Sequence, residues 1–397
     1  MTTIYRTNTP KTPAIVCGNH IMGLGIIRSL GQHKVPVTAV TYETSDMAYL
    51  SKYVNNCLIA PSPLHNERKF IAYLSTLPAR YKGGVLFASD DATLSAVARN
   101  KRTLNKQYRL ACADWNIARK FIDKKYTYEL AHSLGIPAPK SKTARSIEHI
   151  ESFIDDFTFP CLVKPCQSHL FVDKFKTKMN LVHARDALFA EFRKAQESSL
   201  EVMIQEYIPG TDTGGVNYNS FIWQQKCIAE FTAEKVRLSP PGFGVPCVVR
   251  HKPIDEIKGP GRKILKALRF NGYSCTEFKK DPRDGVYKLM EVNGRHNRSG
   301  LLALACGINF PLMEYEFYTQ NRSSANTTVL HDGLYWVDEF KDMATWLKSV
   351  CLMKYPLGEF IRPYINRNVF AVFDRQDIKP FVKRTGDCFS ILKSGKN

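Results

Sequence analysis

An alternation of polar side chains in the segment 288–300 offers the first residues that could do chemistry. Glu291, Asn293 and Arg295 occupy every second position after an apolar start. In an extended strand these side chains point to one face. A carboxylate, an amide and a guanidinium on one face pack poorly against a core. The pattern therefore indicates either a ligand site or a solvated edge.

The sequence Asp-Pro-Arg-Asp-Gly at 281–285 predicts a turn that folds this strand back on the one before it. Counting outward from the turn places Glu277 opposite the segment that contains Glu291, and on the same face. Two carboxylates brought together raise each other's pKa unless a cation lies between them. The oxygen atoms of Glu277, Glu291 and Asn293 suit Mg²⁺, and Arg295 beside them suits a phosphate or a carboxylate. The alternative is a solvated face, neutralised by Lys279, Lys280 and Lys288.

Two more predicted strands end in residues that could hold an anion or a nucleotide. Lys164 lies in Phe-Pro-Cys-Leu-Val-Lys-Pro, so its ammonium group either reaches an anion in a cleft or snorkels from the strand end. Gln205 and Glu206 close another strand before a Pro-Gly break. Backbone groups at such a junction could bind the edge of an adenine, and Asp212 could accept hydrogen bonds from ribose hydroxyls.

Composition limits the class of protein. A chain of 397 residues is too long for one core, so two or three domains are expected. The formal net charge of +19 favours anionic partners. The basic residues are dispersed, without the basic–aromatic alternation of a single-strand binder, so nucleic acid is not expected as the partner. Eleven cysteines without a CxxC pair predict reduced thiols in a cytoplasmic protein. No segment has the length of a signal peptide or of a spanning helix, so no membrane partner is expected.

The order of elements predicts two kinds of fold in one chain. Strands alternate with helices over about the first 110 residues, which predicts a parallel α/β sheet with Asp90 and Asp91 at its carboxyl edge, facing a substrate. The glycines in 18–25 do not fit G-x-G-x-x-G, so NAD binding is a weaker interpretation than packing or another anion. Helices and antiparallel strands follow from residue 115, which predicts an α+β region.

Taken together, these motifs resemble the ATP-grasp superfamily. The motifs that carry the resemblance run in order from Lys124 in FIDKKYTYELAHSLGIPAPK through FPCLVKP, VMIQEYIPGTD, EKVRLSPPGFG and CTEFKKDPRDG to LMEVNGR. The EKVRLSPPGFG segment and the closing NVFAVFDRQDIKPF are similar to carboxylate–amine ligases related to D-aspartate ligase. The resemblance covers about residues 14 to 375. It implies a Rossmann-like pre-ATP-grasp domain (1–113), a central lobe (114–200), a C-terminal lobe with the metal site (201–325) and an appendage (326–397).

The resemblance also implies a role for each motif residue. The residues expected to bind ATP are Lys124, Lys164, Gln205, Glu206, Tyr207, Ile208 and Asp212. The residues expected to bind one or two Mg²⁺ ions, with Mn²⁺ as an alternative, are Glu277, Glu291 and Asn293. The residues expected to stabilise the transferring phosphate are Lys235, Arg237 and Arg295.

Two motifs depart from the family pattern. The flap expected over the phosphates is usually rich in glycine or serine, whereas residues 166–180 contain no glycine and carry Lys174, Lys176 and Lys178. The metal motif reads Asn-Gly-Arg at 293–295, where the family commonly has Asn-Pro-Arg. These departures leave a non-catalytic ATP-binding regulator open as an alternative.

The activity implied is ATP-dependent joining of a carboxylic acid and an amine through an acylphosphate. Such a reaction needs positioning and charge neutralisation rather than a side-chain nucleophile. His20, His169 and His296 are accordingly expected to be structural or to orient substrate. A nucleic-acid-binding protein is the alternative from another class. A homodimer is the default expectation for the assembly.

Overall fold

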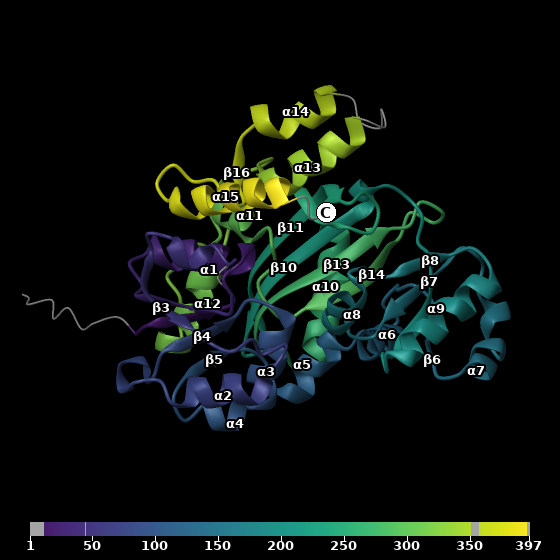
Figure 1. Cartoon of the computed structure of the whole chain (residues 1–397), viewed down its shortest axis with the longest axis horizontal. Coiled ribbons are helices and arrows are strands. Elements are labelled where there is room, and N and C mark those ends of the chain that lie inside the picture. The colour runs from purple at the N-terminus through teal and green to yellow at the C-terminus, as the bar shows by residue number, and fades with distance from the viewer. Residues whose placement is uncertain (1–11, 44, 351–356, 395–397) are drawn as a thin grey trace, which may run out of the picture.

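The structure, a computed structural model, describes residues 12–43, 45–350 and 357–394. Its first part is a five-stranded parallel sheet with the strand order β3-β2-β1-β4-β5, as the alternation of strands and helices predicts (Figure 1). The strands are β1 (Ala14–Cys17), β2 (Val37–Thr41), β3 (Val54–Ile59), β4 (Val85–Ala88) and β5 (Arg109–Ala111). The helices are α1 (Ile21–Gly31), α2 (Glu67–Ser75), α3 (Asp91–Arg99) and α4 (Lys101–Leu104).

The central lobe is built on a four-stranded sheet with the order β6-β9-β7-β8. Its strands are β6 (Ser141–Ala144), β7 (Cys161–Pro165), β8 (Asn180–Val182) and β9 (Val202–Glu206). Its helices are α5 (Trp115–Ile122), α6 (Lys124–Ser133), α7 (Ile147–Glu151), α8 (Ser168–Phe175) and α9 (Arg185–Glu197). The helices α5 and α6 are separated at Asp123, whose carboxylate accepts a hydrogen bond from the Lys125 backbone N–H and caps α6.

The C-terminal lobe is a seven-stranded sheet with the order β14-β13-β10-β11-β12-β15-β16. Its strands are β10 (Gly215–Trp223), β11 (Lys226–Ser239), β12 (Val245–His251), β13 (Gly272–Lys280), β14 (Tyr287–Asn293), β15 (Tyr335–Val337) and β16 (Asn368–Phe370). Its helices are α10 (Lys258–Ala267), α11 (Gly300–Ala305), α12 (Phe310–Gln320), α13 (Glu339–Val350), α14 (Leu357–Ile365) and α15 (Lys379–Ser394). The segment expected to be an appendage therefore contributes two strands, β15 and β16, to the main sheet.

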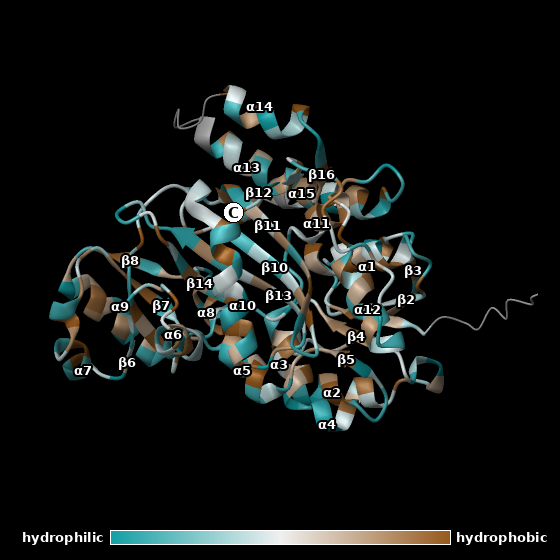
Figure 2. Ribbon diagram, turned by 180° about the vertical axis from the view of Figure 1, so that it is seen from behind, coloured by the Kyte–Doolittle hydropathy of each residue, from teal (hydrophilic) through white to brown (hydrophobic). Residues whose placement is uncertain are grey.

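One hydrophobic core joins the first domain to the C-terminal lobe. Leu24 and Ile27 of α1 belong to the same buried cluster as Leu302 of α11 and Met313 of α12. Figure 2 shows these helices with their hydrophobic residues gathered beside the parallel sheet. The central lobe has a separate cluster drawn from its own strands and helices. The first domain is thus fixed on the C-terminal lobe, and the carboxyl edge of its sheet is fixed with it. Within the described ranges, no helix has both the length and the apolar character needed to cross a bilayer.

Candidate active site

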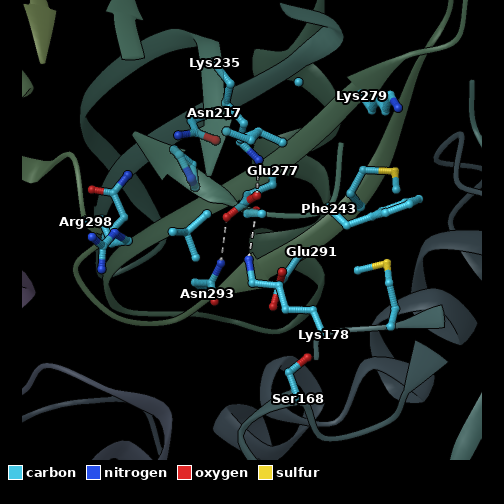
Figure 3. Close-up of a pocket in the computed structure, with 18 of the residues that line it drawn as sticks. Ser168, Lys178, Asn217, Lys235, Phe243, Glu277, Lys279, Glu291, Asn293 and Arg298 are labelled. Atoms are coloured by element: carbon cyan, nitrogen blue, oxygen red, sulfur yellow. Dashed lines mark hydrogen bonds and ion pairs between the residues drawn. The ribbon is translucent and has the colours of Figure 1, made fainter. Parts of the chain in front are cut away.

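The three parts of the fold meet around a cavity of about 440 Å³. Residues from every part line it, beginning with Met22 and Asp91 of the first domain. All but two of the predicted site residues lie on its wall. Those that do are Lys124, Lys164, Gln205, Tyr207, Ile208, Asp212, Lys235, Glu277, Glu291, Asn293 and Arg295. Figure 3 shows several of them converging on the strand face that carries Glu277.

The hairpin β13–β14 brings the two predicted metal-binding carboxylates together. Glu277 pairs directly with Glu291 in the antiparallel ladder, and Met290 is an extra residue that interrupts the register next to them. The Asn293 amide donates a hydrogen bond of 3.3 Å to Glu277 Oε1. The turn predicted at 281–285 closes the hairpin, with the Asp281 backbone N–H donating to the Val286 carbonyl. The alternation and the turn together place these three oxygen-bearing side chains on one face.

Lysines neutralise this pair of carboxylates. Lys235 contacts Glu277, and Lys124 at the start of α6 contacts Glu291. Burial alone would raise the pKa of Glu291, but the positive charges of Lys124 and Lys164 outweigh burial and lower that pKa to about 2. Glu291 is therefore a carboxylate at every physiological pH.

The donor set fits a hard divalent cation. Every candidate ligand is an oxygen atom, which is the preference of Mg²⁺. In addition, Asn217 on neighbouring β10 is only 3% exposed, and its Oδ1 atom has no hydrogen-bond partner in the described part of the chain. Asn217 pairs with Glu277 across β10 and β13. An unpartnered amide oxygen beside two carboxylates is consistent with a site for a cation or its water shell.

Two further lysines, Lys164 and Lys178, line the cavity without an acidic partner among the described residues. Lys164 is 4% exposed, and its Nζ donates to Tyr128 Oη at 2.7 Å and to Gln205 Oε1 at 3.2 Å. Lys178 donates to the Gly244 carbonyl at 3.1 Å. Burial lowers the pKa of each to about 8, against the partly compensating charges of Glu277 and Glu291. Within the described residues neither lysine makes an ion pair. An anion that enters the cavity would therefore be the first negatively charged group in contact with them.

Nucleotide binding at alkaline pH should therefore take up protons. Near pH 9 both lysines are largely neutral in the free protein, and a bound polyanion raises their pKa by favouring the ammonium form. We expect uptake of one to two protons per ATP at pH 9 and much less uptake at pH 7. Titration calorimetry in two buffers of different ionisation enthalpy measures this number. Equal uptake at both pH values would contradict the assignment.

The segment predicted to be an atypical flap is largely helical. Residues Ser168–Phe175 form α8, and the chain then returns toward the cavity at Lys178 and Met179. Ser168 and His169 at the start of α8 also line the cavity. Lysine side chains and one helix end thus occupy the place where a glycine-rich loop was expected.

Asp212, which was expected to bind the ribose, uses its carboxylate to hold a loop of the protein. Its carboxylate accepts hydrogen bonds from the backbone N–H groups of Leu238 at 3.0 Å and Gly242 at 2.9 Å. This contact positions the loop that carries Phe243, whose ring lies 6.2 Å from that of Tyr207. Asp212 therefore lines the cavity and shapes the end where an adenine is expected.

Arg295 connects the first domain to the site. Its Nη2 and Nε atoms both donate to the Asp91 carboxylate, with Nη2 at 2.9 Å from Oδ2. Of the two aspartates expected to face substrate, Asp91 lines the cavity, whereas Asp90 caps α3 by accepting from the Thr93 backbone N–H at 2.8 Å. His296 is buried against Glu314, which agrees with the structural role expected for it.

The structure does not bring Glu206 and Arg237 together with the other predicted residues. The Glu206 carboxylate pairs with Arg283 and accepts from the Lys140 backbone N–H. The Arg237 guanidinium makes two hydrogen bonds of 2.8 Å to the buried carboxylate of Asp342 on α13. Lys235 pairs with Val249 and Arg237 with Val248, so an extra residue between them reverses the alternation of β11. Lys235 consequently faces the cavity and Arg237 faces α13.

Arg237→Ala should destabilise the fold rather than abolish the chemistry. The substitution leaves the Asp342 carboxylate, which is 1% exposed, without its cation. We expect the free energy of unfolding to fall by about 3 to 5 kcal/mol. Asp342→Ala combined with Arg237→Ala should restore part of the loss, because no charge then remains unpaired. Denaturant unfolding measures both effects. A folded Arg237→Ala protein whose turnover at low temperature drops a hundredfold would instead support a catalytic Arg237.

Sequence reasoning missed several polar residues of the wall. Asn217 of β10 lines the cavity, and the alternation of Asn217 and Asn219 along that strand was a detectable sign of a polar strand face. Arg298 follows the metal motif closely, and its guanidinium lines the cavity while contacting the buried carboxylate of Asp338. Asp338 lies 40 residues further along the chain, so the sequence alone did not indicate that it pairs with Arg298.

The chain has the ATP-grasp fold, which confirms the resemblance inferred from its motifs. The structure is similar to L-amino acid ligase from Bacillus licheniformis, with a TM-score of 0.62, 16% identity, and coverage of 81% of this chain and 78% of that chain. It is also similar to N5-carboxyaminoimidazole ribonucleotide synthetase in an ADP complex, with a TM-score of 0.63, 12% identity and 86% coverage of both chains. No protein-family model matches the sequence.

The sequence is similar to that of D-aspartate ligase from Enterococcus faecium. The two are 23% identical over 258 residues, which cover 62% of this chain and 61% of that ligase. The chain spans about three fifths of the length of the curated ligases that it matches.

Proposed function

We propose that this protein is an ATP-dependent carboxylate–amine ligase. The observation that carries the proposal is the pair Glu277 and Glu291, in register on one strand face and surrounded by lysines that project into the same cavity. Paired carboxylates suit Mg²⁺, and the surplus cations suit a triphosphate and an acid. The fold and the similarity to D-aspartate ligase support this interpretation.

The proposed reaction has two steps. A carboxylate oxygen of the acid attacks the γ-phosphorus of ATP, ADP leaves, and an acylphosphate forms. The amine nitrogen then attacks the acyl carbon, phosphate leaves, and an amide forms with loss of a proton. Mg²⁺, when held by Glu277, Glu291 and Asn293, would neutralise charge on the phosphate oxygens.

The cationic residues of the chain supply the remaining charge neutralisation. Among the described residues, Lys164 and Lys178 have no acidic partner to release before they contact phosphate oxygens. Lys235 and Arg295 lie on the same wall and would hold the phosphoryl group during its transfer. Tyr207, Ile208 and the Gln205 amide border the end of the cavity assigned to adenine.

The test is a screen for ADP and phosphate release over pairs of carboxylic acids and amines. The ligase interpretation requires release that depends on both substrates. A protein that binds Mg·ATP but releases no phosphate with any pair would instead be the non-catalytic regulator. A nucleic-acid-binding protein would keep its main activity in Glu277→Ala and lose it steeply with added salt.

The proposal includes a reducing, cytoplasmic location, small-molecule substrates and a possible use of Mn²⁺ in place of Mg²⁺. All ten cysteines in the described part of the chain are free thiols, which is consistent with a reducing compartment. A homodimer remains the expected assembly, and light scattering in solution would test it.

A further inference from the structure

The helices α13 and α14, which we call the hairpin α13–α14, pack against the C-terminal lobe through their inner faces. On that side, Asp342 receives the Arg237 guanidinium and a hydrogen bond of 2.9 Å from Tyr364 Oη. Trp346 of α13 and Phe360 of α14 stack with their ring centres 4.6 Å apart. Figure 1 and Figure 2 both place α14 at the outer margin of the molecule, and its inner side contacts the sheet edge, where the rings of Tyr364 and Phe370 on β16 lie 6.1 Å apart. The hairpin therefore has a well-packed inner side and projects from the body of the protein.

The solvent-exposed faces of α13 and α14 carry aliphatic residues, which together we call the outer stripe. Its members and exposed fractions are Met343 (42%), Leu347 (55%), Leu357 (58%), Ile361 (37%) and Ile365 (76%). On each helix these residues follow one another at a spacing of four, so they lie along a single helical face. Five exposed aliphatic residues on two short, neighbouring helices indicate a contact surface.

Basic residues flank the outer stripe. Lys348 near the end of α13, Arg362 on α14 and Arg367 just after α14 are all exposed. None of the three forms an ion pair within the described ranges. The exposed acidic residue of this hairpin is Glu359, whereas Asp342 is buried beneath it. The outward side of the hairpin thus combines aliphatic and cationic character, on a chain whose formal net charge is +19.

We propose that the hairpin α13–α14 binds the surface of an anionic phospholipid bilayer. An amphipathic helical segment with aliphatic residues flanked by Lys and Arg lies in the bilayer interface, with its apolar side among the acyl chains and its cations among the headgroups. A second copy of the chain is a poorer occupant, because a twofold contact would place identical basic residues close together. The projecting position of the hairpin also lets it meet a flat surface without a clash with the lobes.

This surface contact is independent of the proposed ligase activity and requires no helix that crosses the membrane. The sequence excluded a membrane partner because no segment is long enough to span a bilayer. Binding within the interface uses two short helices instead, and it would bring the cavity close to substrates carried at a membrane.

Vesicle flotation of the full-length protein tests the proposal. The probes are vesicles of phosphatidylcholine alone and vesicles of phosphatidylcholine with phosphatidylglycerol at about 3:1. We expect the protein to bind the anionic vesicles and not the neutral ones. Leu347→Gln with Ile361→Gln should lower the partition coefficient at least about tenfold, because it removes two inserted aliphatic side chains at unchanged net charge.

A matched control separates the hairpin from general attraction of a basic protein to lipid. Ile59→Gln with Leu330→Gln removes two aliphatic residues that are 71% and 63% exposed on other elements. This control should bind like the unaltered protein. Equal losses in both variants, or no binding to anionic vesicles, would overturn the proposal. Light scattering tests the alternative occupant. If the unaltered protein is a dimer and the variant with the two hairpin substitutions is a monomer, the outer stripe binds a second copy of the chain instead of a membrane.

Discussion

Glu291→Gln should lower the rate of ADP formation by a factor of about 10² to 10³ while the protein remains folded. The substitution keeps the shape of the side chain but removes the charge that sits opposite Glu277 in the ladder. A neutral amide is a much weaker ligand for a divalent cation than a carboxylate. The loss should appear mainly in the maximal rate at saturating acid and amine, and it should be only partly recovered by raising the Mg²⁺ concentration.

The same substitution also leaves Lys124, which is 4% exposed, without its carboxylate partner. Some loss of stability is therefore expected, and denaturant unfolding must accompany the kinetic measurement. Glu201→Gln is the matched control, because Glu201 also pairs with a lysine of α6, Lys125, but lies outside the cavity wall. The control should keep its rate. A change of less than tenfold in a folded Glu291→Gln protein would remove Glu291 from the proposed metal site.

Lys164→Met should have opposite effects on function and on stability. The variant loses an ammonium group that has no ion-pair partner in the cavity, so we expect the KM for ATP to rise by about a hundredfold. In the free protein, burial of the charged group lowers the pKa of Lys164 from 10.5 to about 8. A shift of that size corresponds to about 3 kcal/mol of unfavourable free energy at neutral pH.

The sign of the stability effect follows from proton linkage. Because the folded-state pKa is the lower one, the unfolded chain binds more protons between pH 8 and 10.5, and the stability contributed at this position rises with pH across that range. Loss of the hydrogen bonds to Tyr128 and Gln205 offsets part of the gain. We expect the apo variant to be about 1 to 2 kcal/mol more stable at pH 7, with a difference that shrinks above pH 8.

Denaturant unfolding of the nucleotide-free protein at pH 7 and pH 10 measures this difference. Lys142→Met on β6 is the control, because that lysine is 46% exposed and its contact with Asp156 is 3.5 Å long. It should alter neither the KM for ATP nor the stability by a comparable amount. A Lys164→Met protein that is less stable than the parent at pH 7 would show that Lys164 is a structural residue.

The hairpin β13–β14 was predictable from sequence because its determinants are local. A turn with Asp281 and Gly285 fixes the centre of the hairpin, and the period of two along each strand fixes which side chains share a face. The parallel sheet of the first domain was predictable for a similar reason, since its central strands are short apolar runs. The edge strand β3 was not found, because three of its six residues are exposed and polar or small.

The remaining site depends on contacts between distant segments. Nothing near Arg298 in the sequence indicates Asp338, and nothing near Arg295 indicates Asp91. The flap was also beyond sequence reasoning, since a segment with lysines in place of glycines allows both a loop and the helix α8. Arg237 was assigned to the phosphate through the resemblance of EKVRLSPPGFG to the family motif, and nothing in the sequence indicated the irregular pairing that turns it toward α13.

The extra residue in β11, Val236, decides which side chains of this strand face the cavity. It shifts the phase of the strand, so one strand supplies a cation to the cavity and, next to it, an anchor for the hairpin α13–α14. A strand that kept Val236 but paired regularly would place Lys235 and Arg237 two positions apart on one face, which would turn Arg237 toward the cavity and away from Asp342. Two chains can therefore have the same residues at these positions and use the second one differently. The local pairing of the strand, rather than the identity of its residues, decides whether Arg237 anchors the hairpin α13–α14.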